Sequence, residues 1–127
     1  MEPVFLRLDE VIEIHRDQIQ RYGGSPGIRD LHLLKSALAQ PSAGFGGQYL
    51  HRDIFAMAAA YLFHIVQNHP FLDGNKRAGA ASAMVFLLLN DIEVNAREAD
   101  FEKLVFKVAS GKAKKEEIAE FLRKDRD

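Results

Sequence analysis

Hydrophobic positions along the first half of this chain repeat at the spacing of an α-helix. Between residues 8 and 22, apolar side chains recur every three to four positions, and two later runs, over about 31–40 and 53–67, have the same period. Asp30 stands directly before the second run, where an aspartate side chain commonly accepts a hydrogen bond from the first turn of a helix, and the third helix is expected to start near Asp53. The pattern therefore predicts three helices in this half of the chain.

Helical patterns continue in the second half. Residues 75–89 are apolar nearly all round from Ala78 onward, which predicts a helix buried in the middle of the fold. Asn95 and Glu98 have the spacing of a capping box, so a helix is expected to begin there, and a last amphipathic helix is expected over about 114–123.

Strand patterns are rare by comparison. Only two short segments, around Phe45 and over 92–94, allow a β-hairpin. The fold class is therefore predicted to be all-α: a compact bundle of about six helices around a central buried helix, with room for one short hairpin flap.

Length and composition narrow the functional classes. A chain of 127 residues suits one domain spanning 1–127. Its formal net charge of −1 argues against direct binding of nucleic acid, which needs a cationic surface. Cysteine is absent, so disulfides, thiolate metal sites and cysteine nucleophiles are excluded, which suits a cytoplasmic location. We expect no secretion signal and no membrane anchor, because the N-terminus lacks a signal pattern and the longest apolar run, 78–89, is too short to span a bilayer.

Residues 69–77, His-Pro-Phe-Leu-Asp-Gly-Asn-Lys-Arg, concentrate the groups that phosphate chemistry uses. Histidine side chains exchange protons near neutral pH, so His69 is expected to be a general base toward a serine or threonine hydroxyl. Asp73 is assigned to Mg²⁺, which prefers one or two carboxylates together with phosphate oxygens and water. The stretch therefore predicts a catalytic site for phosphoryl or nucleotidyl transfer.

The other residues of this stretch are expected to hold the loop or the phosphates. Phe71 should face inward and anchor the loop, and Gly74 should supply a positive φ or room for a phosphate. Asn75 opens the predicted helix, whose N-terminal N–H groups attract anions, and should bind phosphate oxygens or brace the loop. Lys76 and Arg77 offset phosphate charge, and Arg77 suits a clamp on the oxygens of a transferred phosphoryl group.

The stretch resembles the signature of the Fic/Doc superfamily, His-x-Phe-x-Asp/Glu-Gly-Asn-x-Arg, and Lys76 makes it most similar to the Doc (death-on-curing) toxin branch. In the Fic branch a glycine at this position leaves room for the α-phosphate, and AMP is transferred to a protein hydroxyl. The resemblance to Doc implies a reversed ATP with Mg²⁺, whose γ-phosphoryl group moves to protein. It also implies a toxin of a toxin–antitoxin pair that phosphorylates a threonine of elongation factor Tu and arrests translation.

Two departures from the Fic pattern bear on regulation and reaction. Ala80 stands where that pattern has a second arginine, which further disfavours AMP transfer. The chain also lacks the inhibitory string Ser/Thr-x-x-x-Glu-Gly/Asn of many Fic proteins. The resemblance then implies inhibition in trans by a Phd-like antitoxin, whose disordered tail would fold as a helix against the bundle.

A glycine-rich segment before the motif occupies the position of the family's flap, a hairpin that holds the target by main-chain pairing. It contains Gly44, Phe45, Gly46 and Gly47. These residues are the candidates for target docking by strand addition, and an ordinary loop between helices explains the segment equally well.

Three alternative functions remain open. The first is AMP transfer of the Fic type. The second is a metal hydrolase with His51, His64, His69 and Asp73 as ligands, since imidazole and carboxylate suit zinc or manganese. The third is a helical module without enzymatic activity that binds a nucleotide or only the antitoxin.

Overall fold

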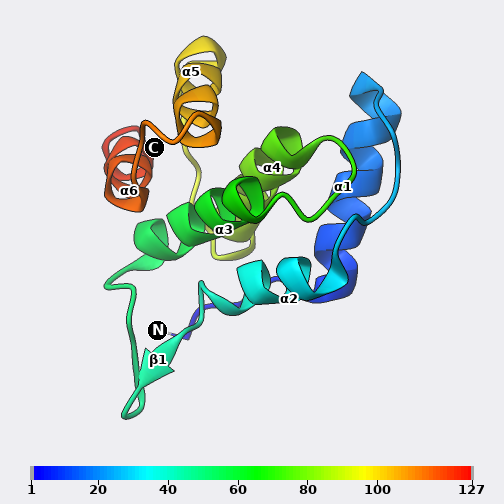
Figure 1. The fold of residues 1–127 in the computed structure, drawn as a ribbon. Coiled ribbons are helices and arrows are strands. Elements are labelled where there is room, and N and C mark those ends of the chain that lie inside the picture. The colour runs from blue at the N-terminus through cyan, green and yellow to red at the C-terminus, as the bar shows by residue number, and fades with distance from the viewer. Residues whose placement is uncertain (1, 127) are drawn as a thin grey trace.

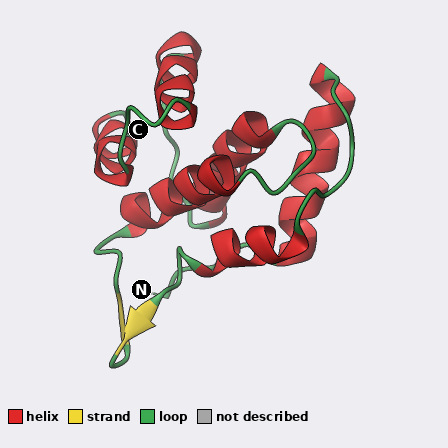
Figure 2. Ribbon diagram, viewed as in Figure 1, coloured by secondary structure: helices red, strands yellow, loops and turns green. Residues whose placement is uncertain are grey.

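A computed structural model describes residues 2–126, which form six helices and one short hairpin (Figures 1 and 2). The elements in chain order are α1 (Leu8–Tyr22), α2 (Leu31–Ala39), β1 (Gly44–Phe45), β2 (Gln48–Tyr49), α3 (Ile54–Asn68), α4 (Asn75–Leu89), α5 (Glu98–Ala109) and α6 (Lys115–Lys124). The all-α fold class is confirmed, and helix ends lie within about two residues of those expected for most helices. Across residues 2–126, every helix is too short or too polar to cross a lipid bilayer.

The centre of the bundle is α3, which packs against α2, α4, α5 and α6 (Figure 1). The sequence predicted this position for α4, and that prediction is wrong. α4 buries one face and leaves Leu88 and Leu89 58% and 42% exposed. The two helices approach closely because Gly79 of α4 has no side chain: a Cβ there would lie 3.1 Å from the carbonyl oxygen of Leu62. The small alanine side chains of α3 likewise let neighbouring helices approach it closely, and α3 is the central helix.

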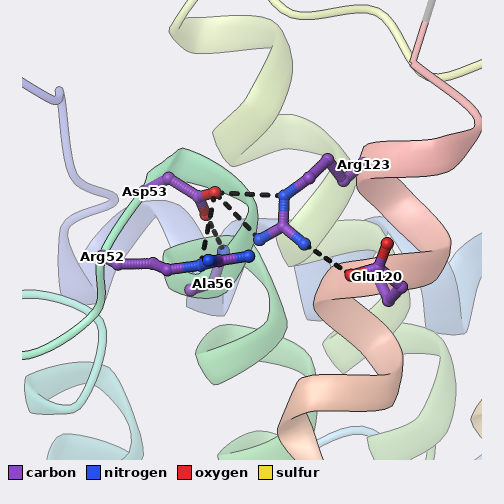
Figure 3. A network of polar contacts seen from close by, with 5 residues as sticks. All are labelled: Arg52, Asp53, Ala56, Glu120 and Arg123. Atoms are coloured by element: carbon purple, nitrogen blue, oxygen red, sulfur yellow. Dashed lines mark hydrogen bonds and ion pairs between the residues drawn. The ribbon is translucent and has the colours of Figure 1, made fainter.

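Aspartate side chains cap α2 and α3, and the cap of α2 is the one that the sequence predicted. The Asp30 carboxylate accepts a hydrogen bond from the N–H of Leu33 at 3.0 Å. Asp53 accepts one from the N–H of Ala56 at 2.9 Å, and its second oxygen accepts from the guanidinium of Arg123 at 2.8 Å. Figure 3 shows how this second contact ties the last turn of α6 to the first turn of α3.

The start of α5 differs from the prediction. Arg97, not Asn95, is the N-cap residue. Asn95 instead donates its backbone N–H to the carbonyl of Asp125 at 2.8 Å, and Val94 forms an isolated antiparallel bridge with Arg126. This pairing with the C-terminal end of the chain keeps the segment extended, so the helix begins two residues later than a cap at Asn95 implies.

β1 and β2 form the hairpin expected around Phe45. Gly44 pairs with Tyr49 and Phe45 with Gln48, while Gly46 and Gly47 make the turn with φ angles of 61° and 81°. Positive φ at both turn positions is typical of a tight two-residue hairpin, and glycine adopts it without strain. In Figure 2 the hairpin stands apart from the helices, and the Phe45 side chain is 87% exposed.

Candidate active site

Residues 69–77 lie between α3 and α4 and line one side of a cavity of about 690 Å³. His69, Asp73, Gly74, Asn75, Lys76 and Arg77 all contribute to its wall, and one face of α5 forms the other side. The structure thus brings the catalytic, metal and phosphate-binding candidates of the sequence into one cavity, whereas the hairpin residues 44–47 are not part of its lining.

His69 is the C-cap of α3 and has a left-handed backbone, with φ 51° and ψ 52°. This conformation costs a non-glycine residue about 1 kcal/mol or more, so contacts with neighbouring residues must stabilise the backbone of His69. Arg29 does so: its Nε donates to the carbonyl of His69 at 2.7 Å and its Nη2 to the carbonyl of Asn68 at 3.1 Å. These carbonyls belong to the end of a helix, where no intrahelical donor is available. Arg29 therefore fixes the turn that carries the histidine.

The segment before α2 also binds the motif loop through its main chain. The N–H groups of Arg29 and Asp30 both donate to the carbonyl of Pro70, at 2.7 and 3.0 Å. In the same segment, residues 27–30, the carbonyl of Gly27 accepts from the N–H of Leu72 at 3.1 Å, and Ile28 forms an antiparallel bridge with Phe71. The loop is consequently held like one strand of a very short sheet.

Asn75 is buried, 4% exposed, and binds the loop from inside. Its Oδ1 accepts from the N–H of Phe71 at 2.9 Å, and its Nδ2 donates to the carbonyl of Phe71 at 3.0 Å and to Nδ1 of His69 at 3.1 Å. The two contacts with Phe71 fix which end of the amide carries the hydrogens. Nδ1 of His69 is therefore an acceptor, and the neutral ring carries its proton on Nε2.

Phe71 and His15 form a stacked pair beneath the loop. Phe71 is fully buried, and the ring of His15 lies parallel to it with centroids 3.8 Å apart. His15 is itself buried, and its Nε2 donates to the carbonyl of Asp73 at 2.8 Å. Because a carbonyl can only accept, this contact sets the proton of His15 on Nε2. A buried pair from α1 and the motif thus supports the loop next to the Asp73 carboxylate.

The carboxylate of Asp73 is exposed and is oriented by two backbone donors. The N–H groups of Ser25 and Gly74 donate to it at 3.2 and 2.8 Å. These hydrogen bonds, that from Ser25 first, lower the pKa of Asp73 below its ordinary value, with smaller contributions from the nearby cations. Each oxygen retains lone pairs for a cation, so Asp73 is an ionised, oriented carboxylate at the rim of the cavity.

The first turn of α4 has the features of an anion-binding helix end. Gly74, its N-cap with φ 76°, has no side chain that could accept from the N–H groups of this turn. Lys76 and Arg77 follow immediately and are exposed, and the Arg77 guanidinium lies 4.8 Å from the ring centroid of Tyr22. The helix dipole, these N–H groups and the two cations all favour negative charge at this end of the cavity.

The sequence did not identify the residues that position the motif from a distance. His15 and Arg29 act on main-chain carbonyls of the motif loop, and the N–H of Ser25 donates to the Asp73 carboxylate. The only available signal for Arg29 was that the resemblance to the Fic/Doc superfamily extends over residues 27–30, Gly-Ile-Arg-Asp. His15 falls on the apolar face of its helix and is indistinguishable there from an ordinary core histidine.

The four-ligand metal site considered above is contradicted. Within residues 2–126, His, Cys, Asp and Glu side chains nowhere gather in a group of three that could hold a metal ion. Nε2 of His51 faces the carbonyl of Gln40 at 3.1 Å, and Nε2 of His64 faces Nζ of Lys115 at 3.1 Å. Burial first, and then the charge of Lys115, lower the pKa of His64 to about 4. Both rings are occupied by structural contacts.

Comparisons with known proteins agree with the geometry. Residues 5–87 match the family described as the Fic/DOC family. The chain is 30% identical over 116 residues to the protein kinase doc of Escherichia phage P1, an alignment that covers 91% of this chain and 90% of that protein. It is 37% identical over 81 residues to the toxin Doc of Mycolicibacterium smegmatis, covering 64% of this chain and 60% of that protein.

Proposed function

This chain belongs to the Fic/DOC family, and from that premise we propose that it is a toxin with protein kinase activity, which transfers the γ-phosphoryl group of ATP to a serine or threonine hydroxyl. The observation that carries the proposal is the cavity itself: an imidazole, an oriented carboxylate and an uncapped, cationic helix end line one wall. The similar protein from phage P1 is named a protein kinase, which supports the same reaction.

The phosphates of ATP bind at the start of α4. Backbone N–H groups of the first turn, together with Lys76 and Arg77, offset their charge, and phosphoryl transfer depends on this kind of electrostatic stabilisation. Lys76 fills the position beside Asn75 that a glycine leaves open in the AMP-transferring branch. Its bulk and charge favour the γ-phosphate, rather than the α-phosphate, next to His69.

Asp73 fits the requirements of a magnesium ligand. Mg²⁺ usually binds one or two carboxylates and completes its shell with phosphate oxygens and water, and Asp73 offers an ionised, preoriented carboxylate at the cavity wall. When bound, the ion supplies charge neutralisation for the transferred group. Ser25 and Gly74 hold the carboxylate in orientation through their N–H groups.

His69 receives the proton of the attacking hydroxyl. The hydroxyl oxygen bonds to the γ-phosphorus, the bond to the bridging oxygen breaks, and ADP leaves. Accepting the proton at Nε2 requires the tautomer with hydrogen on Nδ1, so the hydrogen bond from Asn75 is given up for the reaction. A net cost of about 1 kcal/mol follows from the loss of one such bond.

The protein substrate that we propose is a translation factor, with elongation factor Tu the first choice because of the resemblance to Doc. The hairpin of residues 44–49 has exposed edges that could pair with an extended segment of the target, which supports its role as the flap. A Phd-like antitoxin is proposed as the inhibitory partner, since one of the similar proteins is named as a toxin.

The decisive experiment uses ATP labelled separately at the α and γ phosphorus. Purified protein is incubated with Mg²⁺ and elongation factor Tu, with the His69→Ala variant as the inactive control. Label from γ-ATP on the factor, with ADP as product, is the expected result. Label from α-ATP with release of pyrophosphate would identify AMP transfer and overturn the kinase proposal. Equal labelling by His69→Ala would remove the catalytic role of the histidine.

A further inference from the structure

Arg77, at the phosphate-binding end of the cavity, is held by an aromatic ring. Its guanidinium lies over the ring of Tyr22, with Cζ 4.8 Å from the ring centroid. Within residues 2–126, Arg77 forms no ion pair with a carboxylate and its side chain donates no hydrogen bond. The guanidinium is therefore fixed by a contact that leaves its charge without a counter-ion.

This kind of contact suits an arginine that binds phosphate. A carboxylate would occupy N–H groups of the guanidinium and would compete with a phosphate oxygen for the same charge. An aromatic ring attracts the guanidinium through its π-electrons and uses none of its N–H groups, which point outward in the plane of the guanidinium. Tyr22 can therefore hold Arg77 in place while every N–H group stays available to an anion.

Arg21, the residue before Tyr22, shows the contrasting arrangement. Its Nε donates to both carboxylate oxygens of Asp17, one turn earlier in α1, at 3.0 and 2.9 Å. Arg21 is not part of the cavity lining, whereas Arg77 is. The arginine outside the cavity is thus neutralised by an ion pair, and the arginine that lines the cavity is held by a ring.

The end of α1 places the ring. Tyr22 is the last residue of this helix and is 58% exposed, and Gly23 follows with φ 86°. Shortly after this turn, the N–H of Ser25 donates to the carboxylate of Asp73 at 3.2 Å. The same end of α1 therefore contacts the motif twice, once at the carboxylate of Asp73 and once at the guanidinium of Arg77.

We propose that Tyr22 is a positioning residue, whose ring holds the Arg77 guanidinium at the start of α4 for the oxygens of a phosphate chain. The inference rests on the proposed function, which supplies the phosphates. An unrestrained arginine loses side-chain freedom when it binds an anion, and the ring restrains Arg77 before the anion arrives. Removing the ring should therefore weaken phosphate binding, and it should do so only through Arg77.

Calorimetric titration with inorganic tripolyphosphate and Mg²⁺ tests this role without requiring the transfer reaction. Tyr22→Leu keeps an apolar side chain but removes the ring, and it is expected to weaken binding about two- to thirtyfold, the range for loss of one cation–π contact. Tyr22→Phe is the matched control, because it keeps the ring and removes only the hydroxyl, so its binding should stay within twofold of the unmodified protein. In an Arg77→Ala background, adding Tyr22→Leu should weaken binding by less than twofold, because the guanidinium through which the ring acts is gone.

The outcomes separate this inference from the function on which it rests. If Tyr22→Leu binds tripolyphosphate like Tyr22→Phe, or loses equal affinity with and without Arg77, the positioning role is refuted and the kinase proposal stands. If the expected pattern of binding is found but the γ label never reaches protein, the kinase proposal falls and the positioning role stands. If the unmodified protein does not bind tripolyphosphate, both are refuted. Thermal melting checks that the variants fold, which the exposure of Tyr22 leads us to expect.

Discussion

Replacing Asn75 with alanine should destabilise the protein far more than an asparagine on a helix normally does. The variant loses three hydrogen bonds and leaves the N–H and carbonyl of Phe71, a fully buried residue, without these partners. Each unsatisfied buried backbone group costs about 1–3 kcal/mol. The free energy of unfolding should therefore fall by about 2–5 kcal/mol, which is a large part of the stability of a small domain.

Urea denaturation followed by circular dichroism measures this loss. Asn95→Ala is the matched control, because Asn95 is exposed and only its backbone makes a hydrogen bond in the described structure. That variant should stay within about 0.5 kcal/mol of the unmodified protein. A loss below about 1 kcal/mol for Asn75→Ala, or one equal to that of the control, would refute the reasoning.

The hydrogen bond from Asn75 also predicts which ring nitrogen of His69 carries the proton. Nitrogen-15 NMR of the imidazole ring should find hydrogen on Nε2 in the unmodified, ligand-free protein, because Nδ1 accepts from Asn75. In Asn75→Ala this constraint disappears, and the ring should populate both tautomers. Hydrogen on Nδ1 in the unmodified protein would contradict the proposed hydrogen bond.

Three further predictions address the loop, pH and the choice of phosphate. Arg29→Ala should lower the free energy of unfolding by only about 1 kcal/mol, because the side chain is exposed, but it should slow phosphoryl transfer at least tenfold because the turn that holds His69 is released. The control Arg97→Ala, which removes another exposed arginine, should change neither quantity. Unchanged turnover of Arg29→Ala would contradict the positioning role. The pKa of His64, lowered to about 4, lies below that of an unfolded histidine, so its contribution to stability is present above about pH 6.5 and is lost as the pH falls toward 4. When the pH is lowered from about 6.5 to 4, the free energy of unfolding should therefore fall less in His64→Gln than in the control His32→Gln. The difference between the two variants should be below about 3 kcal/mol, because the ring of His64 is partly exposed and solvent screens its charge. Lys76→Gly should shift the label on the target from the γ toward the α phosphorus of ATP, and an unchanged γ label would refute the selective role of this lysine.

Features encoded locally were predictable from the sequence, and those created by distant segments were not. The cap at Asp30 depends on Leu33, three positions away, so its pattern is visible in the chain. The start of α5 depends on pairing with residues 125–126, and the capping pattern at Asn95 gave the wrong answer. The central position of α3 depends on how closely helices approach at Gly79, which hydrophobicity alone does not reveal.

The candidate site divides in the same way. The motif of residues 69–77 is contiguous, so its chemistry could be predicted from residue types and order. The groups that orient it lie 39–58 positions earlier, in Arg29, Ser25 and His15. Each of these contacts has a main-chain atom on one side, and every residue possesses such atoms, so there is no pattern of paired side chains to search for. The α5 wall was missed because its residues also satisfy the ordinary pattern of an amphipathic helix.

The segment between α1 and α2, residues 25–30, has a consequence for how the protein can be inhibited. Residues 25–30 supply the backbone donors for Asp73 and Pro70 and the guanidinium that steadies the end of α3. A binding partner that displaced residues 25–30 would remove the hydrogen bonds that hold the turn carrying His69, without contacting the imidazole or competing with nucleotide. Such an inhibitor would be insensitive to ATP concentration, and amide hydrogen exchange at Leu72 would accelerate when it bound.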